Sequence, residues 1–105
     1  MVKCPTKQTP CLIFEKIPCM ETKILARKLK DMDIRLYMYK LLQAVEHTHS
    51  HGIMHRDIKP LNIVINHEKR DLRLIDYGLA EYYHPDRTYS SSVATRYYKA
   101  PELLI

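Results

Sequence analysis

Residues 34–51 place the strongest constraint on the fold of this chain, because their apolar side chains repeat with a helical period. These side chains recur three and four residues apart, as on one face of an amphipathic helix: Ile34, Tyr37, Met38, Leu41, Leu42 and Val45. Asp31 or Asp33 is suited to cap the start of the helix, and Gly52 to end it in the left-handed conformation. The tyrosine and methionine on this face are predicted to lie in the core.

A polar stretch follows the helix, within the sequence IMHRDIKPLNIVI at residues 53–65. Taken alone, it is typical of a polar turn between a helix and a strand. The apolar runs at 62–65 and 72–75 are rich in strand-forming residues and are separated by the polar segment 66–71. They predict a β-hairpin.

The remaining segments give weaker signals. Residues 11–17 are a short apolar run before Pro18 and predict a strand, and residues 20–30 predict a short helix. The last part of the chain, 79–105, has little periodicity and is predicted to form a long ordered loop, a type that is usually functional. Without internal repeats or a linker, the chain is expected to form one α+β domain or part of one.

Composition limits the classes of partner. The formal net charge is +5 at pH 7, which favours a basic surface or a site for anions such as phosphates, acidic peptides or nucleic acid. No apolar run approaches the roughly 20 residues of a membrane span, and the first residues do not have the pattern of a secretory signal. A membrane partner is therefore not expected.

The cysteines and histidines give no strong metal motif. Cys4, Cys11 and Cys19 form no Cys-x-x-Cys pair, so reduced thiols of the cytoplasm or nucleus are expected. His47 and His51 are four residues apart near the predicted helix end, a spacing that can hold a metal. No acidic or cysteine partner accompanies them in a known motif, so a metal-free helix end is the favoured interpretation.

Three short motifs in order point to one family. They are HRDIKPLN at 55–62, DYG at 76–78 and APE at 100–102. Together they resemble the catalytic loop, the metal-binding Asp-Phe-Gly and the end of the activation segment of protein kinases. Segments 33–85 and 3–17 are most similar to the casein kinase II catalytic alpha subunits. The stretch VATRYYKAPELL resembles the cyclin-dependent and mitogen-activated kinases at least as well.

The resemblance implies a role for each polar side chain of the first two motifs. Asp57 would orient the attacking hydroxyl and accept its proton, and Lys59 would reach the γ-phosphate. Asn62 and Asp76 would hold Mg²⁺ through hard oxygen ligands, together with the phosphates of ATP. We therefore expect Asp57, Asn62 and Asp76 to converge in the fold.

The resemblance also implies nucleotide contacts near the start of the chain. Phe14 corresponds to the gatekeeper, and the Glu15 carbonyl with the Ile17 backbone would grip the adenine of ATP or, as an alternative, the base of GTP. Tyr77 departs from the pattern, because most kinases have Phe there and casein kinase II has Trp.

The resemblance also assigns basic residues to contacts with the activation segment and with the protein substrate. Arg56 is placed to meet charge on that segment, and Arg96 and Lys99 correspond to residues that recognise acidic substrates. Ser92 replaces a further basic residue of that group, which weakens the predicted acidic preference. Phosphate on the segment would pair with Arg56 or Arg96 and order the loop; the candidate positions are Thr88, Ser90, Ser91, Ser92 and Thr95.

The expected architecture is a partial protein-kinase-like fold. Residues 1–17 correspond to the end of the N-lobe and the hinge strand. Residues 18–105 correspond to the mainly helical start of the C-lobe, the catalytic loop, the β-hairpin and the activation segment. The sequence contains only two glycines, Gly52 and Gly78, and therefore no Gly-rich phosphate loop; it also lacks the Val-Ala-Ile-Lys strand. These 105 residues alone are expected to be inactive.

The predicted function is a casein kinase II alpha-like Ser/Thr protein kinase of the cytoplasm and nucleus, acting on Ser or Thr in acidic contexts. The regulatory beta subunit is the partner implied for a full-length relative. An alternative is a catalytically inactive, pseudokinase-like fragment that acts as a binding module. A nucleic-acid-binding module is less favoured, because the basic residues are scattered and match no such signature.

Overall fold

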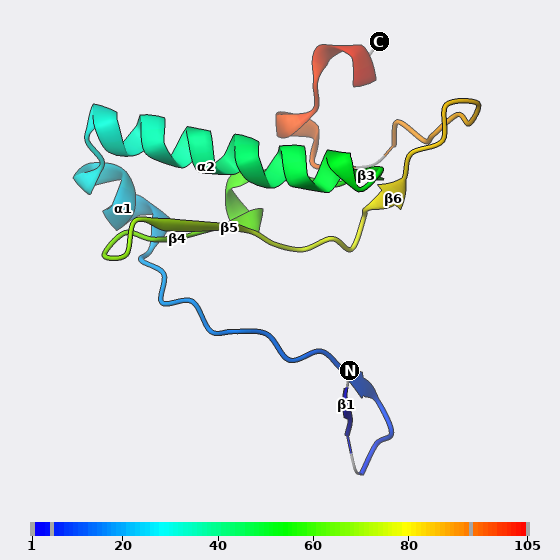
Figure 1. Cartoon of the computed structure of the whole chain (residues 1–105), viewed down its shortest axis with the longest axis horizontal. Helices are drawn as coiled ribbons and strands as arrows, with labels where there is room; N and C mark the ends of the chain where they lie inside the picture. Colours follow the sequence, from blue (N-terminus) through cyan, green and yellow to red (C-terminus); the bar gives the residue numbers. More distant parts are fainter. Residues whose placement is uncertain (1, 5, 93, 105) are drawn as a thin grey trace.

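The computed structural model describes residues 2–4, 6–92 and 94–104, which form a mixed set of helices and short strands (Figure 1). The elements are β1 Val2–Lys3, β2 Pro10–Cys11, α1 Thr22–Lys28, α2 Asp31–Ser50, β3 Ile53–Met54, η1 Pro60–Asn62, β4 Ile63–Asn66, β5 Asp71–Leu74, β6 Glu81–Tyr82, η2 Arg96–Tyr98 and η3 Pro101–Leu103. Within the described ranges the strands pair as β1–β2, β3–β6 and β4–β5, all antiparallel. This mixture agrees with the predicted α+β class.

The long helix α2 begins and ends at identifiable signals. Lys30 is its N-cap residue, and the backbone N–H of Lys30 donates to Asp33 Oδ2 at 3.1 Å, so Asp33 closes the first turn from inside the helix. At the other end Gly52 has a φ of +67°, and its N–H donates to the carbonyl of His49 at 2.8 Å. The predicted termination of this helix at Gly52 is confirmed.

The predicted β-hairpin is present. β4 pairs with β5 in antiparallel register, from Ile63 opposite Leu74 to Asn66 opposite Asp71. Figure 1 shows the hairpin lying along the first part of α2, and β5 is the strand that packs most closely on this helix. The polar turn at residues 67–70 therefore lies beside the start of α2.

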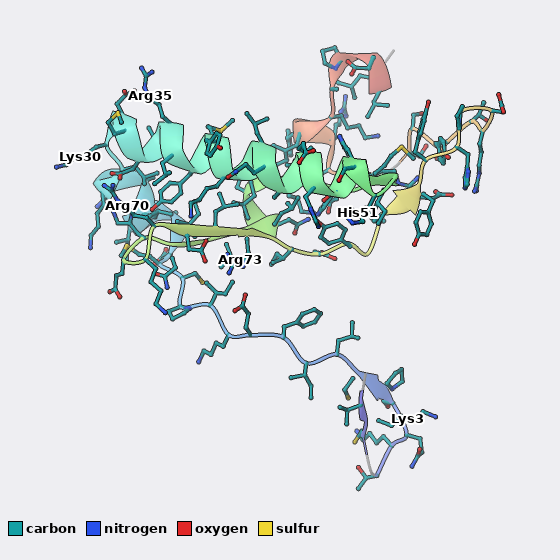
Figure 2. The ribbon with its side chains drawn as sticks, viewed as in Figure 1. Lys3, Lys30, Arg35, His51, Arg70 and Arg73 are labelled. Carbon is teal, nitrogen blue, oxygen red and sulfur yellow. The ribbon has the colours of Figure 1, made fainter. Side chains whose placement is uncertain are left out.

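Side chains of that turn fix the hairpin to the helix. The hydroxyl of Tyr37 is 2.8 Å from Nδ1 of His67, and Arg70 Nη2 is 3.0 Å from the buried carboxylate of Asp33. Figure 2 shows Arg70 beside the first turn of α2. Burial is the main cause that raises the pKa of Tyr37 above its usual value. The hairpin is thus held to α2 by polar contacts at its turn.

The pair β3–β6 was not predicted. Ile53 lies opposite Tyr82 and Met54 opposite Glu81, and the backbone N–H of Tyr83 donates to the carbonyl of Gly52 at 2.8 Å. Each strand has two residues, too few for an alternating pattern to be read from the sequence. The pair joins the residues that follow α2 to the segment after Gly78. The loop at residues 55–62 begins directly after β3.

The strand predicted over residues 11–17 is largely absent. β2 covers only Pro10–Cys11, and residues 12–20 have no regular structure. Phe14 is 79% exposed, and Figure 1 shows this segment extending away from the helices. A strand needs neighbours that take up its backbone N–H and C=O groups, and among the described residues only β1 pairs with β2. The prediction is therefore wrong beyond Cys11.

The apolar face of α2 is only partly covered. Tyr37 is buried, but Ile34 is 50%, Met38 52% and Leu42 62% exposed, so the predicted core position of Met38 is wrong. The hairpin packs on the Tyr37 side of the helix and leaves these three side chains in solvent. In the part of the chain that the structure describes, no helix is long and apolar enough to cross a membrane.

Candidate active site

The loop between β3 and η1 closes on itself around Asp57. Asp57, Asn62 and His55 are 6%, 4% and 2% exposed, although all three are polar. Asn62 ends η1, where its amide nitrogen donates to the backbone carbonyl of Asp57 at 2.8 Å and to Asp57 Oδ2 at 3.0 Å. Because Pro60 starts η1 with a fixed φ, the turn that presents Asn62 to Asp57 is stiff. These contacts fix the orientation of the Asp57 carboxylate.

Lys59 supplies the positive charge of this cluster. Its ammonium nitrogen is 2.6 Å from Asp57 Oδ2 and 3.2 Å from Thr95 Oγ1. The hydrogen bond from Lys59 is the main cause that holds the pKa of Asp57 below its usual value, and Asn62 acts in the same direction. Asp57 is therefore ionised near neutral pH, and its negative charge is balanced by Lys59.

Thr95 joins this cluster from far along the chain. It is the N-cap residue of η2, and its backbone N–H also contributes to lowering the pKa of Asp57. From the sequence, Thr95 is predicted only as a phosphorylation position. Its place beside Lys59 depends on how the segment after β6 folds back, which no local pattern indicates.

Asn62 and Asp76 lie at neighbouring positions of the hairpin. The N–H of Ile75 donates to the Asn62 carbonyl at 2.9 Å, which places Asp76 one residue beyond this contact. Asp76 has a φ of +63° and is exposed, and its Oδ1 accepts a hydrogen bond from the N–H of Gly78 at 3.2 Å. The structure thus joins Asp57 and Asn62 directly, while Asp76 follows the residue that hydrogen-bonds to the Asn62 backbone.

The donor set suits Mg²⁺. The amide nitrogen of Asn62 is used by Asp57, which leaves its amide oxygen for a cation, and Asp76 presents an exposed carboxylate. Within the described ranges no three His, Cys, Asp or Glu side chains gather into a complete metal site. Mg²⁺ takes one or two protein ligands together with phosphate oxygens and waters, so these two side chains fit the protein's share of such a site.

His55 links the catalytic loop to the segment of Asp76. Its Nε2 is 3.1 Å from the carbonyl of Ile75, which only accepts, so the proton lies on Nε2. Its Nδ1 then accepts the backbone N–H of Asp57 at 3.3 Å. The ring also meets Tyr77 edge-on, with centroids 4.6 Å apart. His55 thus sets the spacing between Asp57 and the residues around Asp76.

Tyr77 is tied to α2 by a side-chain hydrogen bond. Thr48 Oγ1 donates to the carbonyl of Ala44 at 2.8 Å, so its lone pairs remain to accept from the Tyr77 hydroxyl at 2.9 Å. Thr48 is buried within the helix. The residue after Asp76 is therefore anchored on a rigid element. From the sequence, Tyr77 is only a departure from the family pattern, and its contact with Thr48 is not predicted.

Arg56 contacts charge in the following segment, as the resemblance implies. It is 2.9 Å from Glu81 Oε2, and its Nε donates to the carbonyl of Leu79 at 2.7 Å. Glu81 also pairs with Arg87 at 2.8 Å. Arg56 has a φ of +64°, a conformation that these contacts support. The Glu81 carboxylate thus pairs with Arg56, the residue predicted to pair with a phosphate.

The other predicted basic residues lie outside the Asp57 cluster. Lys99 donates to the carbonyl of Ser91 at 2.7 Å and thereby fastens the end of the segment. Arg96 begins η2 and is exposed. Both residues follow Thr95 in the sequence, and among the described residues neither is joined to Asp57 or Lys59 by a hydrogen bond or ion pair.

The predicted nucleotide contacts are not gathered with the cluster. Phe14 and Glu15 are exposed and Ile17 is half-buried, all in the segment without regular structure. Glu15 instead pairs with Arg73 on β5, at 3.1 Å. The structure therefore places Asp57, Lys59 and Asn62 together and the predicted adenine contacts apart from them.

A carboxylate fixed by a lysine and an amide, with two oxygen-bearing side chains that suit Mg²⁺, is an arrangement compatible with phosphoryl transfer. Comparison with known families gives the same result: residues 3–105 match the family described as protein kinase domain. The chain belongs to the protein kinase family. Members of this family generally use ATP and Mg²⁺.

Proposed function

We propose that the chain carries the phosphate-transfer part of a casein kinase II alpha-like Ser/Thr protein kinase. The observation that carries the proposal is the cluster in which Asp57 accepts hydrogen bonds from Lys59 and Asn62 and Lys59 reaches Thr95. The substrates would be ATP, with GTP as an alternative, and a protein Ser or Thr.

Each residue of the cluster has a chemical task. Asp57 orients the hydroxyl of the substrate and accepts its proton, for which its carboxylate is ionised and held in a fixed position by Lys59 and Asn62. Lys59 keeps positive charge beside the transferring phosphoryl group. Asn62 and Asp76 provide the protein oxygens for Mg²⁺, which neutralises phosphate charge when bound. Positioning and charge neutralisation are most of what this reaction requires of a protein.

Acidic substrates are the proposed specificity class. The family resemblance of Arg96 and Lys99 supports it, together with the net charge of +5. Arg96 is exposed, whereas Lys99 holds the Ser91 carbonyl and would have to exchange that contact for a substrate carboxylate. The same resemblance supports a location in cytoplasm and nucleus and, for a full-length relative, the regulatory beta subunit as partner.

A second candidate, a catalytically inactive binding fragment, is favoured by two observations. Phe14 lies 79% exposed in a segment without regular structure, and the 105 residues contain no Gly-rich loop. Among the residues that the structure describes, no segment is then placed to fix the α- and β-phosphates for in-line transfer. We expect the 105-residue protein to fall several powers of ten below the roughly 1–100 s⁻¹ of active kinases.

Metal binding tests the site separately from turnover. Mn²⁺ serves as a paramagnetic probe of the Mg²⁺ site, added with ADP while the amide NMR signals are recorded. Signals near Asn62 and Asp76 should broaden in the wild-type protein and recover on addition of excess Mg²⁺. Asp76→Asn should abolish the broadening. Unselective broadening, or none at saturating Mn²⁺ and ADP, would overturn the proposed site.

Phosphate transfer tests the choice between the two candidates. The assay uses Mg²⁺-ATP and a Ser peptide flanked by Asp and Glu, with a matched peptide that carries Asn and Gln instead. No transfer above background is expected from the 105-residue protein. Clear transfer that disappears in Asp57→Asn and Asp76→Asn would show that the chain is active alone. Equal use of both peptides would then contradict the acidic preference.

A further inference from the structure

The C-terminal end of α2 carries two histidine rings side by side. His47 and His51 are both exposed, and their ring centroids are 4.4 Å apart with an interplanar angle of 52°. Within the described ranges no hydrogen bond takes up a ring nitrogen of His47. The pair lies outside the Asp57 cluster, and none of the roles proposed above uses it.

The tautomer of His51 is set by its surroundings. Its Nδ1 is 2.8 Å from the carbonyl of His47, which only accepts, so Nδ1 carries the proton. Ser50 Oγ, 3.3 Å from the same Nδ1, already donates its own proton to that carbonyl at 2.8 Å. The lone pair of the neutral ring is therefore on Nε2, which faces away from these contacts. A ring that donates one N–H to a backbone carbonyl is the usual state of a metal-binding histidine.

The backbone below the rings is fixed. Gly52, with a φ of +67°, donates its N–H to the His49 carbonyl at 2.8 Å, and the N–H of His51 donates to Thr48 at 3.3 Å. The carbonyl of Gly52 in turn accepts from Tyr83 at 2.8 Å. Figure 2 shows His51 at this end of the helix. The two rings are thus carried on a closed helix end and not on a loose segment.

The electrostatic field at the C-terminal end of α2 favours a bound cation. The C-terminal end of a helix carries partial negative charge from carbonyls without intrahelical partners, and α2 has twenty residues. Two neutral imidazoles at positions i and i+4 suit Cu²⁺, Ni²⁺ or Zn²⁺, with waters in the remaining coordination positions. Mg²⁺ prefers oxygen ligands and is not expected to compete here.

We propose that His47 and His51 form a surface site for a borderline divalent transition-metal ion at the C-terminal end of α2. The site is independent of the kinase chemistry and binds the ion through two imidazole nitrogens. Binding ties the residue after the helix to its last turn, so the bound ion stabilises this end of α2.

Titration with Ni²⁺ followed by calorimetry tests the proposal. The protein carries no affinity tag, and Cys4, Cys11 and Cys19 are alkylated in every sample so that thiols do not bind the ion. Excess Mg²⁺ is present throughout. We expect one binding event in the wild-type protein, weakened about tenfold or more in His47→Asn and in His51→Asn. His49→Asn is the matched control, because His49 is exposed on the same turn, and it should bind as the wild type does.

Stability gives a second measurement that does not depend on calorimetric heat. Ni²⁺ should raise the urea midpoint of the wild-type protein and of His49→Asn, and leave the midpoints of the other two variants unchanged. Circular dichroism verifies that each variant keeps its helix. Unchanged affinity in either His47→Asn or His51→Asn, or equal loss in His49→Asn, would overturn the assignment.

Discussion

At the scale of single residues, the charge of Asp57 is coupled to folding. Lys59 holds the pKa of Asp57 below its value in the unfolded chain, about 3.9 for an ordinary aspartate. The ionised carboxylate therefore stabilises the fold fully above about pH 4, and this contribution is lost as the pH falls through the lower pKa of the folded state. Urea unfolding should show a steeper loss of stability between pH 6 and pH 2, roughly, in the wild-type protein than in Asp57→Asn. Equal losses would contradict the coupling.

The hydroxyl of Tyr77 gives a second prediction at this scale. Tyr77→Phe removes the hydrogen bond to Thr48 and keeps the ring beside His55, so the free energy of unfolding should fall by about 1 kcal/mol. Thr48→Val should lose a similar amount, and the double variant less than the sum of both, because the two changes remove one shared bond. Tyr39→Phe is the control. The Tyr39 hydroxyl lies on an exposed face beside Gln43, and the change should stay within about 0.5 kcal/mol.

At the scale of elements, Gly52 determines where α2 stops. A Cβ at this position meets nothing within 4 Å, so only its φ of +67° opposes a side chain. Gly52→Ala should therefore destabilise the protein by about 1–2 kcal/mol, the cost of the left-handed conformation for an ordinary residue. Gly52→Asn should cost less, because asparagine tolerates this conformation. Equal unfolding free energies for the two variants would show that backbone conformation is not the cause.

The elements also show what the sequence could and could not predict. Periodicity was sufficient for α2, and a polar turn between two short apolar runs was sufficient for the hairpin, because both patterns are local. The strand predicted at 11–17 failed because apolar composition does not supply a pairing neighbour. β3, β6 and the contact between Lys59 and Thr95 were missed because they join segments distant in the chain. Motif spacing predicted Asp57, Lys59, Asn62 and Asp76 as site residues, and the structure joins the first three by hydrogen bonds; it did not predict the exposure of Phe14.

At the scale of the whole molecule, α2 packs against β5 and β3 but is covered on one side only. In the part of the chain that the structure describes, the buried apolar side chains are Leu25, Tyr37 and Leu72. Ile34, Met38 and Leu42 instead form an exposed apolar stripe along the helix. Such a stripe favours association with other apolar surfaces, and in a purified sample the available surface is another copy of the chain.

The double variant Met38→Gln and Leu42→Gln tests this consequence. Both side chains are more than half exposed, so each change should alter the free energy of unfolding by no more than about 0.5 kcal/mol. Sedimentation velocity should show self-association of the wild-type protein and a monomer for the double variant at the same concentration. Tyr37→Ala is the contrasting change: Tyr37 is buried, so it should cost about 3–5 kcal/mol and reduce the helical signal. Undiminished association of the double variant would contradict the role of Met38 and Leu42, the two most exposed side chains of the stripe.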